Sequence, residues 1–235
     1  MEKNETTERK QVKSRQRVRD HGEVFTAERE VKAMCDLVGD VGSNPTSGTV
    51  LEPACGNGNF LVEILERKFD RLDASGWRMG GRSGKWCWQL SELYAFRAAT
   101  VLTLLYGIDL LPDNVAECRQ RLQEIALVRF DAVAKGRDAA SRALLEKAAD
   151  VILGINIVCG DALTFRAETA PLVFVKWRAE EDGDRFAFGI TPYYFETLVN
   201  GEEHGQGDLF SAKPLLDRSP QIRFSEIEKV KEFLP

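Results

Sequence analysis

A glycine-bearing turn between a short strand and a helix is the feature that most limits how this chain can fold. The strand is expected at residues 49–51, the turn is residues 52–59 (EPACGNGN), and the helix continues to about Phe69. Because glycine has no side chain, a ligand can approach the backbone of such a turn closely. In an open sheet of parallel strands, the turn lies outside the carboxyl ends of the strands, where ligands bind. The turn therefore favours an α/β protein with a ligand at one edge of its sheet.

Strands and helices alternate through the first two thirds of the chain. Strands are expected at residues 106–109 and 156–159, each preceded by a segment with helical apolar spacing. Thr26 is expected to cap the helix that follows it, and Pro112 opens a later helix at a position where proline is tolerated. This alternation predicts an α/β fold with a mostly parallel sheet and helices on both faces. Helices are expected at residues 27–38, 59–69, 89–105 and 138–153, and from 112 onward.

The pattern changes after Asp161. Residues 172–177 and 185–188 are rich in β-branched and aromatic side chains and flank an acidic turn, which predicts a β-hairpin. Residues 201–207 are polar, and residues 225–234 have the spacing of a short amphipathic helix. We therefore expect a charged tail or helix at 1–20, a main domain at 21–200 with a small C-terminal β-hairpin appendage, and a polar loop and helix at 201–235.

Composition excludes several classes of protein. With 43% hydrophobic and 29% charged residues, the chain is not disordered, collagen-like or a coiled coil. Its apolar runs are far shorter than the ~20 residues that a membrane span needs, so no membrane contact is expected. The five cysteines form no C-x-x-C pair, and His21 and His204 are isolated, so neither a disulfide framework nor a metal site is expected. The expected location is the reducing cytoplasm.

The formal charge of −5 argues against a chain that coats nucleic acid by charge alone. Residues 1–20 nevertheless alternate lysine, arginine and glutamate with little apolar content. Such a segment is typical of a solvated helix or tail, and it also suits a basic arm that contacts a phosphate backbone. The sequence leaves both interpretations open.

Acidic residues follow two of the expected strands. The dinucleotide pattern G-x-G-x-x-G is absent, because Leu61 stands where the third glycine belongs, so pyrophosphate binding is not favoured. Asp109 ends the second strand and Asp161 follows the third, which places both acids near the glycine turn. A carboxylate there can accept ribose hydroxyls, and the other can accept an adenine amino group. Leu110 and Ala162, beside these acids, could pack on the base.

Four segments in the same order resemble the amino-group DNA methyltransferases, and in particular the adenine-N6 enzymes of type I and related restriction–modification systems. EPACGNGNFL resembles motif I of that family, D-P-A-C-G-S-G-x-F-L. HGEVFT resembles the family's G-E-x-[FY]-T-P segment, with Ala27 in place of proline, and Glu52 replaces the commoner aspartate of motif I. YGIDLLPDN resembles motif II and GDAL motif III, so the resemblance covers about residues 20–165.

The resemblance implies a Rossmann-like methyltransferase fold that binds S-adenosylmethionine. It places Asp109 at the ribose and Asp161 at the adenine ring, and it places the glycine turn and the HGEVFT segment at the methionine end. The full set of implied cofactor-binding residues is Phe25, Thr26, Glu52, Pro53, Ala54, Cys55, Gly56, Asn59, Phe60, Asp109, Leu110, Asp161 and Ala162.

The family's catalytic motif IV, [DNS]-P-P-[YFW], is not recognisable in this sequence. In the family, this motif accepts hydrogen bonds from the target amino group and stacks on the flipped-out base. The nearest segment is Thr191-Pro192-Tyr193, followed by Tyr194, but threonine lacks the amide or carboxylate oxygen. The segment is either a degenerate catalytic loop or a turn into a helix, and the catalytic residues are unassigned.

Three functions are compatible with these features. The first is a DNA (adenine-N6) methyltransferase subunit of a restriction–modification or defence system. The second is a catalytically inactive methyltransferase-like subunit for binding or assembly, which the missing motif favours. The third is a methyltransferase that acts on RNA, protein or a small molecule. The segment after Gly160 is short for a target-recognition domain, so the first function predicts DNA as substrate and a partner subunit that supplies sequence recognition or the missing motif.

Overall fold

The structure is a computed structural model that describes residues 11–38, 44–74, 88–136, 138–183, 185–200, 209–210 and 212–235. Its helices are α1 (Arg15–His21), α2 (Glu28–Leu37), α3 (Asn59–Ala74), α4 (Trp88–Leu102), α5 (Pro112–Ala134), α6 (Ala139–Asn156), α7 (Phe195–Asn200) and the 3-10 helix η1 (Phe224–Phe233). Its strands are β1 (Val50–Glu52), β2 (Leu105–Asp109), β3 (Ile157–Cys159), β4 (Arg166–Ala167), β5 (Ala170–Pro171), β6 (Val173–Asp182), β7 (Arg185–Tyr194) and β8 (Gln221–Arg223).

A small parallel sheet in the order β1-β2-β3 lies at the centre of the fold. All three strands were expected from the sequence, and they are parallel as predicted. The register pairs Glu52 with Gly107 and Asp109 with Cys159, so the carboxyl ends of the strands meet at one edge. The turn that follows β1 therefore lies beside the last residue of β2.

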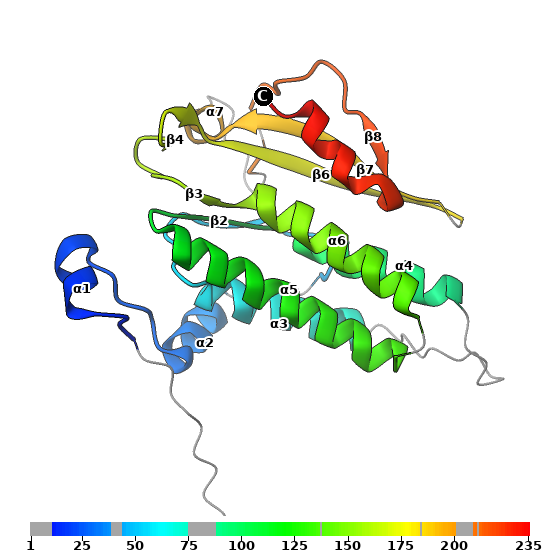
Figure 1. The fold of residues 1–235 in the computed structure, drawn as a ribbon, viewed down its shortest axis with the longest axis horizontal. Helices are drawn as coiled ribbons and strands as arrows, with labels where there is room; N and C mark the ends of the chain where they lie inside the picture. Colours follow the sequence, from blue (N-terminus) through cyan, green and yellow to red (C-terminus); the bar gives the residue numbers. More distant parts are fainter. Residues whose placement is uncertain are drawn as a thin grey trace, which may run out of the picture.

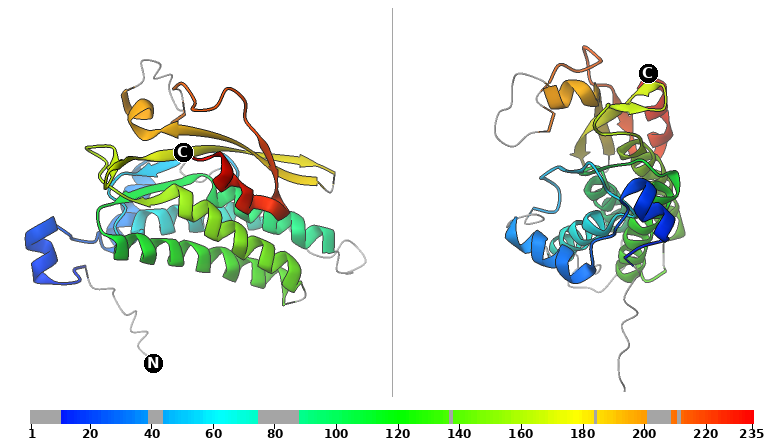
Figure 2. Two further views of the ribbon diagram at one scale, coloured as in Figure 1. Left: turned by 45° about the horizontal axis from the view of Figure 1, so that its top comes forward. Right: turned by 90° about the vertical axis from the view of Figure 1, so that its left-hand side faces the viewer.

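The two faces of the parallel sheet have different covers. Because side chains alternate along a strand, Gly107 and Tyr106 of β2 face opposite sides. Gly107 faces Leu61 of α3, whereas the Tyr106 hydroxyl donates a 2.6 Å hydrogen bond to the carbonyl oxygen of Val175 in β6. Figures 1 and 2 show the long helices gathered on one side of the parallel strands and the β6-β7-β8 sheet on the other. The prediction of a mostly parallel sheet with helices on both faces therefore holds only in part, and the fold is a mixed α/β arrangement of parallel and antiparallel sheets.

The predicted hairpin exists and is longer than expected. β6 and β7 pair antiparallel over ten residues each. Phe96 of α4 stacks on Phe186 with ring centroids 5.1 Å apart, and the indole N–H of Trp177 donates a 3.0 Å hydrogen bond to Oδ1 of Asn156. Because these residues belong to one continuous buried core, the hairpin is not the small appendage that the sequence predicted.

The segment 191–194 is the last part of β7, not a turn. Pro192 lies opposite Val175 of β6, and its carbonyl oxygen accepts a 2.8 Å hydrogen bond from the N–H of Leu215. Helix α7 begins directly after Tyr194. The expected C-terminal helix is present as η1, and the expected loop at 201–207, with His204, lies outside the described residues.

The helices begin and end close to the expected positions. Pro112 opens α5 as predicted. Helix α2 is capped by Ala27 and not by Thr26, and the Glu30 carboxylate accepts a 3.2 Å hydrogen bond from the Ala27 N–H. This bond satisfies the N–H of the cap residue, and in the described part of the chain the N–H groups of the first turn receive no side-chain cap. Among the described residues, no helix has the length and apolarity that crossing a bilayer requires.

Candidate functional site

The glycine turn after β1 is held tightly against its neighbours. The Cys55 N–H donates a 2.8 Å hydrogen bond to the carbonyl oxygen of Ile108 in β2. Gly56 and Gly58 have φ angles of 53° and 87°, in the left-handed region that L-residues avoid. A Cβ atom on Gly58 would lie 2.5 Å from Sγ of Cys118 in α5. Position 58 therefore requires glycine for its backbone angle and for the close approach of α5.

The structure brings Asp109 to this turn. Its Oδ2 atom accepts a 3.0 Å hydrogen bond from the Gly56 N–H. Its Oδ1 atom accepts hydrogen bonds of 2.9 Å from the Leu111 N–H and 3.1 Å from the side-chain amide of Asn114. The acid expected to receive a ribose is therefore fixed in orientation at the tip of β2.

Asp161 has a local role in its own turn. Its Oδ1 atom accepts a 2.8 Å hydrogen bond from the Leu163 N–H, and this bond holds the pKa of the Asp161 carboxyl below its usual range. The strand ends are joined by a 2.9 Å bond from the Gly160 N–H to the Asp109 carbonyl oxygen. Within the described part of the chain, no hydrogen bond links the Asp161 side chain to Asp109 or to the glycine turn.

Residues 11–27, which we call the N-terminal strap, reach the same edge. Phe25 is buried, and its ring lies 3.2 Å from where a Cβ atom of Gly56 would stand. The side-chain amide of Asn59 donates a 2.9 Å hydrogen bond to the carbonyl oxygen of Thr26. The resemblance assigned these four residues to the methionine end of a cofactor, and the fold brings them together.

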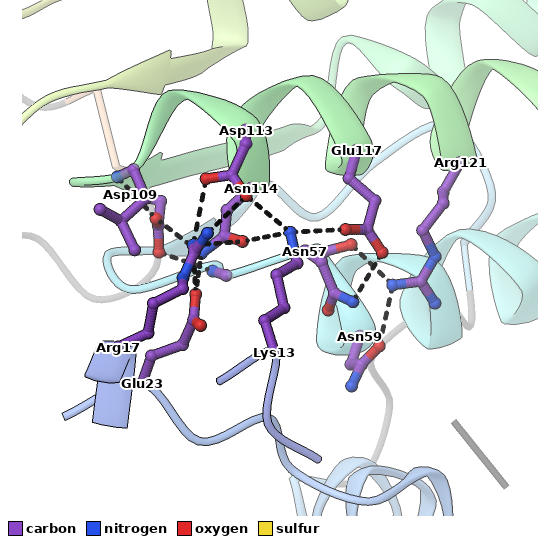
Figure 3. A network of polar contacts seen from close by, with 12 residues as sticks. Lys13, Arg17, Glu23, Asn57, Asn59, Asp109, Asp113, Asn114, Glu117 and Arg121 are labelled. Carbon is purple, nitrogen blue, oxygen red and sulfur yellow. Dashed lines mark hydrogen bonds and ion pairs between the residues drawn. The ribbon is translucent and has the colours of Figure 1, made fainter. Parts of the chain in front are cut away.

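The strap is attached to α5 by charged groups (Figure 3). Arg17 pairs with Glu23 and with Asp113, each at 2.6 Å. Lys13 pairs with Asp113 at 3.0 Å and with Glu117 at 2.8 Å. The hydrogen bond from Arg17 holds the pKa of the Asp113 carboxyl well below its usual range. Of the predicted charged tail or helix, Arg15–His21 form the helix α1 without a buried residue, and residues 1–10 lie outside the described residues.

The outer side of the glycine turn is also bound to α5. The amide of Asn57 donates a 2.9 Å hydrogen bond to Glu117, and Arg121 donates 2.6 Å and 2.8 Å bonds to the Asn57 carbonyl and to Oδ1 of Asn59. Burial raises the pKa of Glu117, but the hydrogen bonds from Lys13 and Asn57 outweigh it, so the net pKa is lowered. The first three turns of α5 thus place one acid, Glu117, and one base, Arg121, against the turn.

Three buried polar atoms at this edge have no hydrogen-bond partner: Oε2 of Glu23, Oδ1 of Asn57 and Nε of Arg17. In the part of the chain that the structure describes, they are the only buried side-chain nitrogen or oxygen atoms in this condition. Buried polar groups are nearly always paired in folded proteins, so a cluster of unpaired ones indicates capacity for a polar ligand. Two of the three atoms are acceptors, which suits a ligand that donates hydrogen bonds.

Sequence reasoning missed most of this polar cluster. Glu23 stands inside the HGEVFT segment, and Asn114 lies five residues after Asp109, in the first turn of α5. A side chain in the first turn of a helix that follows a strand tip lies beside that tip, and this signal could have identified Asn114. Nothing local in the sequence pairs Arg17 with residues of α5, which are about a hundred positions away.

The remaining expected cofactor residues form the surface of the site. Pro53, Ala54 and Leu110 are exposed, whereas Glu52, Phe60 and Ala162 are half-buried. The Glu52 carboxylate accepts a 3.3 Å hydrogen bond from the Ala54 N–H. Cys55 is buried, and a hydrogen bond with Cys118 together with burial raises the pKa of its thiol, so it is not an activated nucleophile.

The segment Thr191-Pro192-Tyr193 lies in the antiparallel sheet. β7 ends on the same side of the molecule as the carboxyl ends of β2 and β3 (Figures 1 and 2). The Thr191 hydroxyl is hydrogen-bonded to the Ser219 hydroxyl, and the Tyr193 ring is buried against Phe210 with centroids 5.2 Å apart. Neither side chain is free to meet an incoming base.

Comparisons with protein-family models, with curated proteins and with solved structures return no match to this chain. Among the described residues, no group of three histidine, cysteine, aspartate or glutamate side chains is placed to hold a metal ion.

Proposed function

We propose that this chain is a Rossmann-like methyltransferase domain that binds S-adenosylmethionine, and that it acts as a subunit of a DNA (adenine-N6) methylation system. The observation that carries the proposal is the hydrogen bond from Gly56 to Asp109, which joins the glycine turn to the acid at the end of the next strand. This layout suits the adenosyl part of a cofactor, because the acid at the strand tip can accept hydroxyl protons.

The residues present fit the cofactor in type and in order. Phe25, Thr26 and Glu52 would hold the methionine end, and Asp109 would take the ribose. Leu110 and Leu163 are exposed apolar side chains beside the two strand tips, at 59% and 89% exposure, and they would pack on the adenine. The unpaired side-chain oxygens of Glu23 and Asn57 could accept further hydrogen bonds from the ligand. The cofactor would supply an electrophilic methyl group to a nucleophilic nitrogen, a reaction that depends mainly on positioning.

DNA is the proposed substrate because the whole motif order, including HGEVFT, resembles the amino-group DNA methyltransferases. In that chemistry, a flipped base stacks on an aromatic ring while an oxygen accepts hydrogen bonds from its amino group. Thr191 and Tyr193 do not offer those groups, since one hydroxyl is bound to Ser219 and the other side chain is buried. We therefore propose that a partner subunit supplies the base-binding groups and the sequence recognition.

The alternative is a subunit that binds the cofactor but takes no part in methyl transfer. The same two contacts of Thr191 and Tyr193 favour it. The two functions share the cofactor site and differ in turnover when the partner is present.

Titration of the purified chain with S-adenosylhomocysteine in a calorimeter tests cofactor binding, which both functions require. We expect the wild-type chain to bind, and we expect Asp109→Ala and Asp109→Asn to lose about tenfold or more in affinity. Asp150→Asn, which changes an exposed acid on α6, is the matched control and should bind as the wild type does. Absence of binding by the folded wild-type chain would refute the proposal.

Transfer of a labelled methyl group to unmethylated DNA separates the two functions. The chain alone should bind the cofactor without labelling DNA. Labelling by the chain alone would show that the base-binding groups lie within it. No labelling with any co-purifying partner would favour the subunit without turnover.

A further inference from the structure

The Asp109 carboxylate already accepts most of the hydrogen bonds that it can accept. An ionised carboxylate has about four acceptor positions, two on each oxygen. Leu111 and Asn114 fill both positions of Oδ1, and Gly56 fills one of the two on Oδ2. Asp109 can therefore accept one more hydrogen bond and cannot take both hydroxyl protons of a ribose.

The Glu23 carboxylate has one oxygen that accepts no hydrogen bond. Both of its hydrogen bonds reach Oε1, at 2.6 Å from Arg17 and at 2.7 Å from the Asn114 amide. Oε2 has no partner, although only 6% of the side chain is exposed. A buried carboxylate oxygen without a donor costs free energy, which a ligand donor would recover.

Asn114 holds the two carboxylates side by side (Figure 3). Its side-chain nitrogen donates to Oε1 of Glu23 and to Oδ1 of Asp109, so these oxygens lie within about 6 Å of each other. The open acceptor positions are on Oε2 of Glu23 and on Oδ2 of Asp109, the second oxygens of these two neighbouring carboxylates. Asn114 itself is buried, at 1% exposure, and is a positioning residue.

We infer that Glu23 is a second ligand-binding carboxylate, and that Glu23 and Asp109 each accept one hydroxyl proton of the ribose of an adenosyl ligand. The inference rests on the proposed function and goes beyond it, because it divides ribose recognition between the N-terminal strap and the tip of β2. The strap then belongs to the binding site itself.

Affinities for deoxy analogues test this division. The full-length chain is titrated with S-adenosylhomocysteine and with its 2′-deoxy and 3′-deoxy analogues. Glu23→Gln keeps an oxygen for Arg17 and Asn114 but replaces Oε2 by a donor, so we expect the parent ligand to bind about ten- to a hundredfold more weakly. One of the two deoxy analogues should bind wild type and Glu23→Gln equally, because it lacks the hydroxyl that Glu23 accepts.

Three comparisons make the result decisive. Glu124→Gln, an exposed carboxylate on α5, should change nothing. Arg17→Met loosens the strap that carries Glu23, and it should weaken all three ligands, the parent ligand most. If Glu23→Gln does not fold, Glu23→Asp shortens the side chain while keeping its charge and should show the same selective loss.

The outcomes also separate this inference from the proposed function. Unchanged binding by folded Glu23→Gln, or an equal loss for the parent ligand and both analogues, overturns the inference and leaves the cofactor proposal standing. Failure of the wild-type chain to bind any of the three ligands overturns both.

Discussion

The backbone N–H of Gly56 donates a 3.0 Å hydrogen bond to Oδ2 of Asp109, a residue 53 positions further along the chain. The bond forms because β1 and β2 are parallel neighbours whose carboxyl ends meet at the same edge. It closes the turn onto the acid and leaves one acceptor position of Oδ2 open. The local geometry of the site is thus a direct result of strand order.

Gly58→Ala should destabilise the fold by about 3 kcal/mol or more. The new methyl group would meet Sγ of Cys118 at 2.5 Å, and the φ angle of 87° is itself unfavourable for alanine. Chemical denaturation of the two proteins measures the difference in the free energy of unfolding.

Gly136→Ala is the matched control for this change. Its φ angle is 68° and nothing lies within 4 Å of the new Cβ, so only the backbone cost of about 1 kcal/mol should appear. Combining Gly58→Ala with Cys118→Ala should recover part of the loss. Equal losses at positions 58 and 136 would mean that α5 does not press on the turn.

Titration of Lys68 should make the free energy of unfolding rise with pH. The rise should extend from about pH 8 to the pKa that lysine has in the unfolded chain. This side chain is 1% exposed, and its amine donates to the carbonyl oxygens of Asn44 and Ser47. Burial lowers its pKa from 10.5 to about 8. Over that window the unfolded chain binds the proton more tightly than the folded chain does, so stability increases with pH, by up to about 3 kcal/mol.

Comparison with Lys68→Met isolates this contribution, because the variant has no proton to release. The difference in unfolding free energy between the two proteins should change in favour of the wild type from pH 8 to 10.5. A difference that stays constant over that range would show that Lys68 keeps an ordinary pKa.

Arg17→Met should release the strap while leaving the core folded. Arg17 pairs with Glu23 inside the strap and with Asp113 of α5, and the second pair ties residues 11–27 to α5 together with the pairs of Lys13. Hydrogen exchange measured by mass spectrometry should become faster in the strap and stay unchanged in α3 and α6. Arg19→Met, whose described ion pair is with its neighbour Asp20, should leave the exchange of the strap as it is.

Trp177→Phe should cost about 2–4 kcal/mol and should not divide the unfolding into two steps. The indole N–H donates to the buried Asn156, whose oxygen would lose its partner, and a cavity would remain. Arg178→Ala, on the exposed side of β6, should change stability by less than about 0.5 kcal/mol. A separate early transition for the hairpin would contradict the shared core.

Local patterns in the sequence predicted the parallel strands well. The three strands are short apolar runs, and each is followed by residues that end a strand: the glycine turn follows β1, Pro112 follows β2 and Gly160 follows β3. Helix α2 is capped one residue later than expected, at Ala27, where the Glu30 carboxylate accepts a hydrogen bond from the Ala27 N–H. These features depend on neighbours in the chain, which a sequence displays directly.

Long-range packing was less predictable. The hairpin looked peripheral because its strands follow the main pattern, yet Tyr106 and Phe96 bury it against the parallel sheet and α4. The site shows the same division. Asp109 was identified from its strand, whereas Glu23 and Arg17 contact α5 only because the strap folds back over about ninety residues of chain.

The direction of Pro192 in β7 has a consequence for the end of the antiparallel sheet. In an antiparallel pair, the N–H and C=O of one residue point to the same side, and the Pro192 carbonyl points to Leu215, away from β6. Beyond Gly189, where the pairing with β8 ends, the segment 215–220 covers this flank of β7 with hydrogen bonds to Ile190 and Pro192. Because proline has no N–H, residue 192 joins that segment through its carbonyl oxygen alone, and the antiparallel ladder does not continue there.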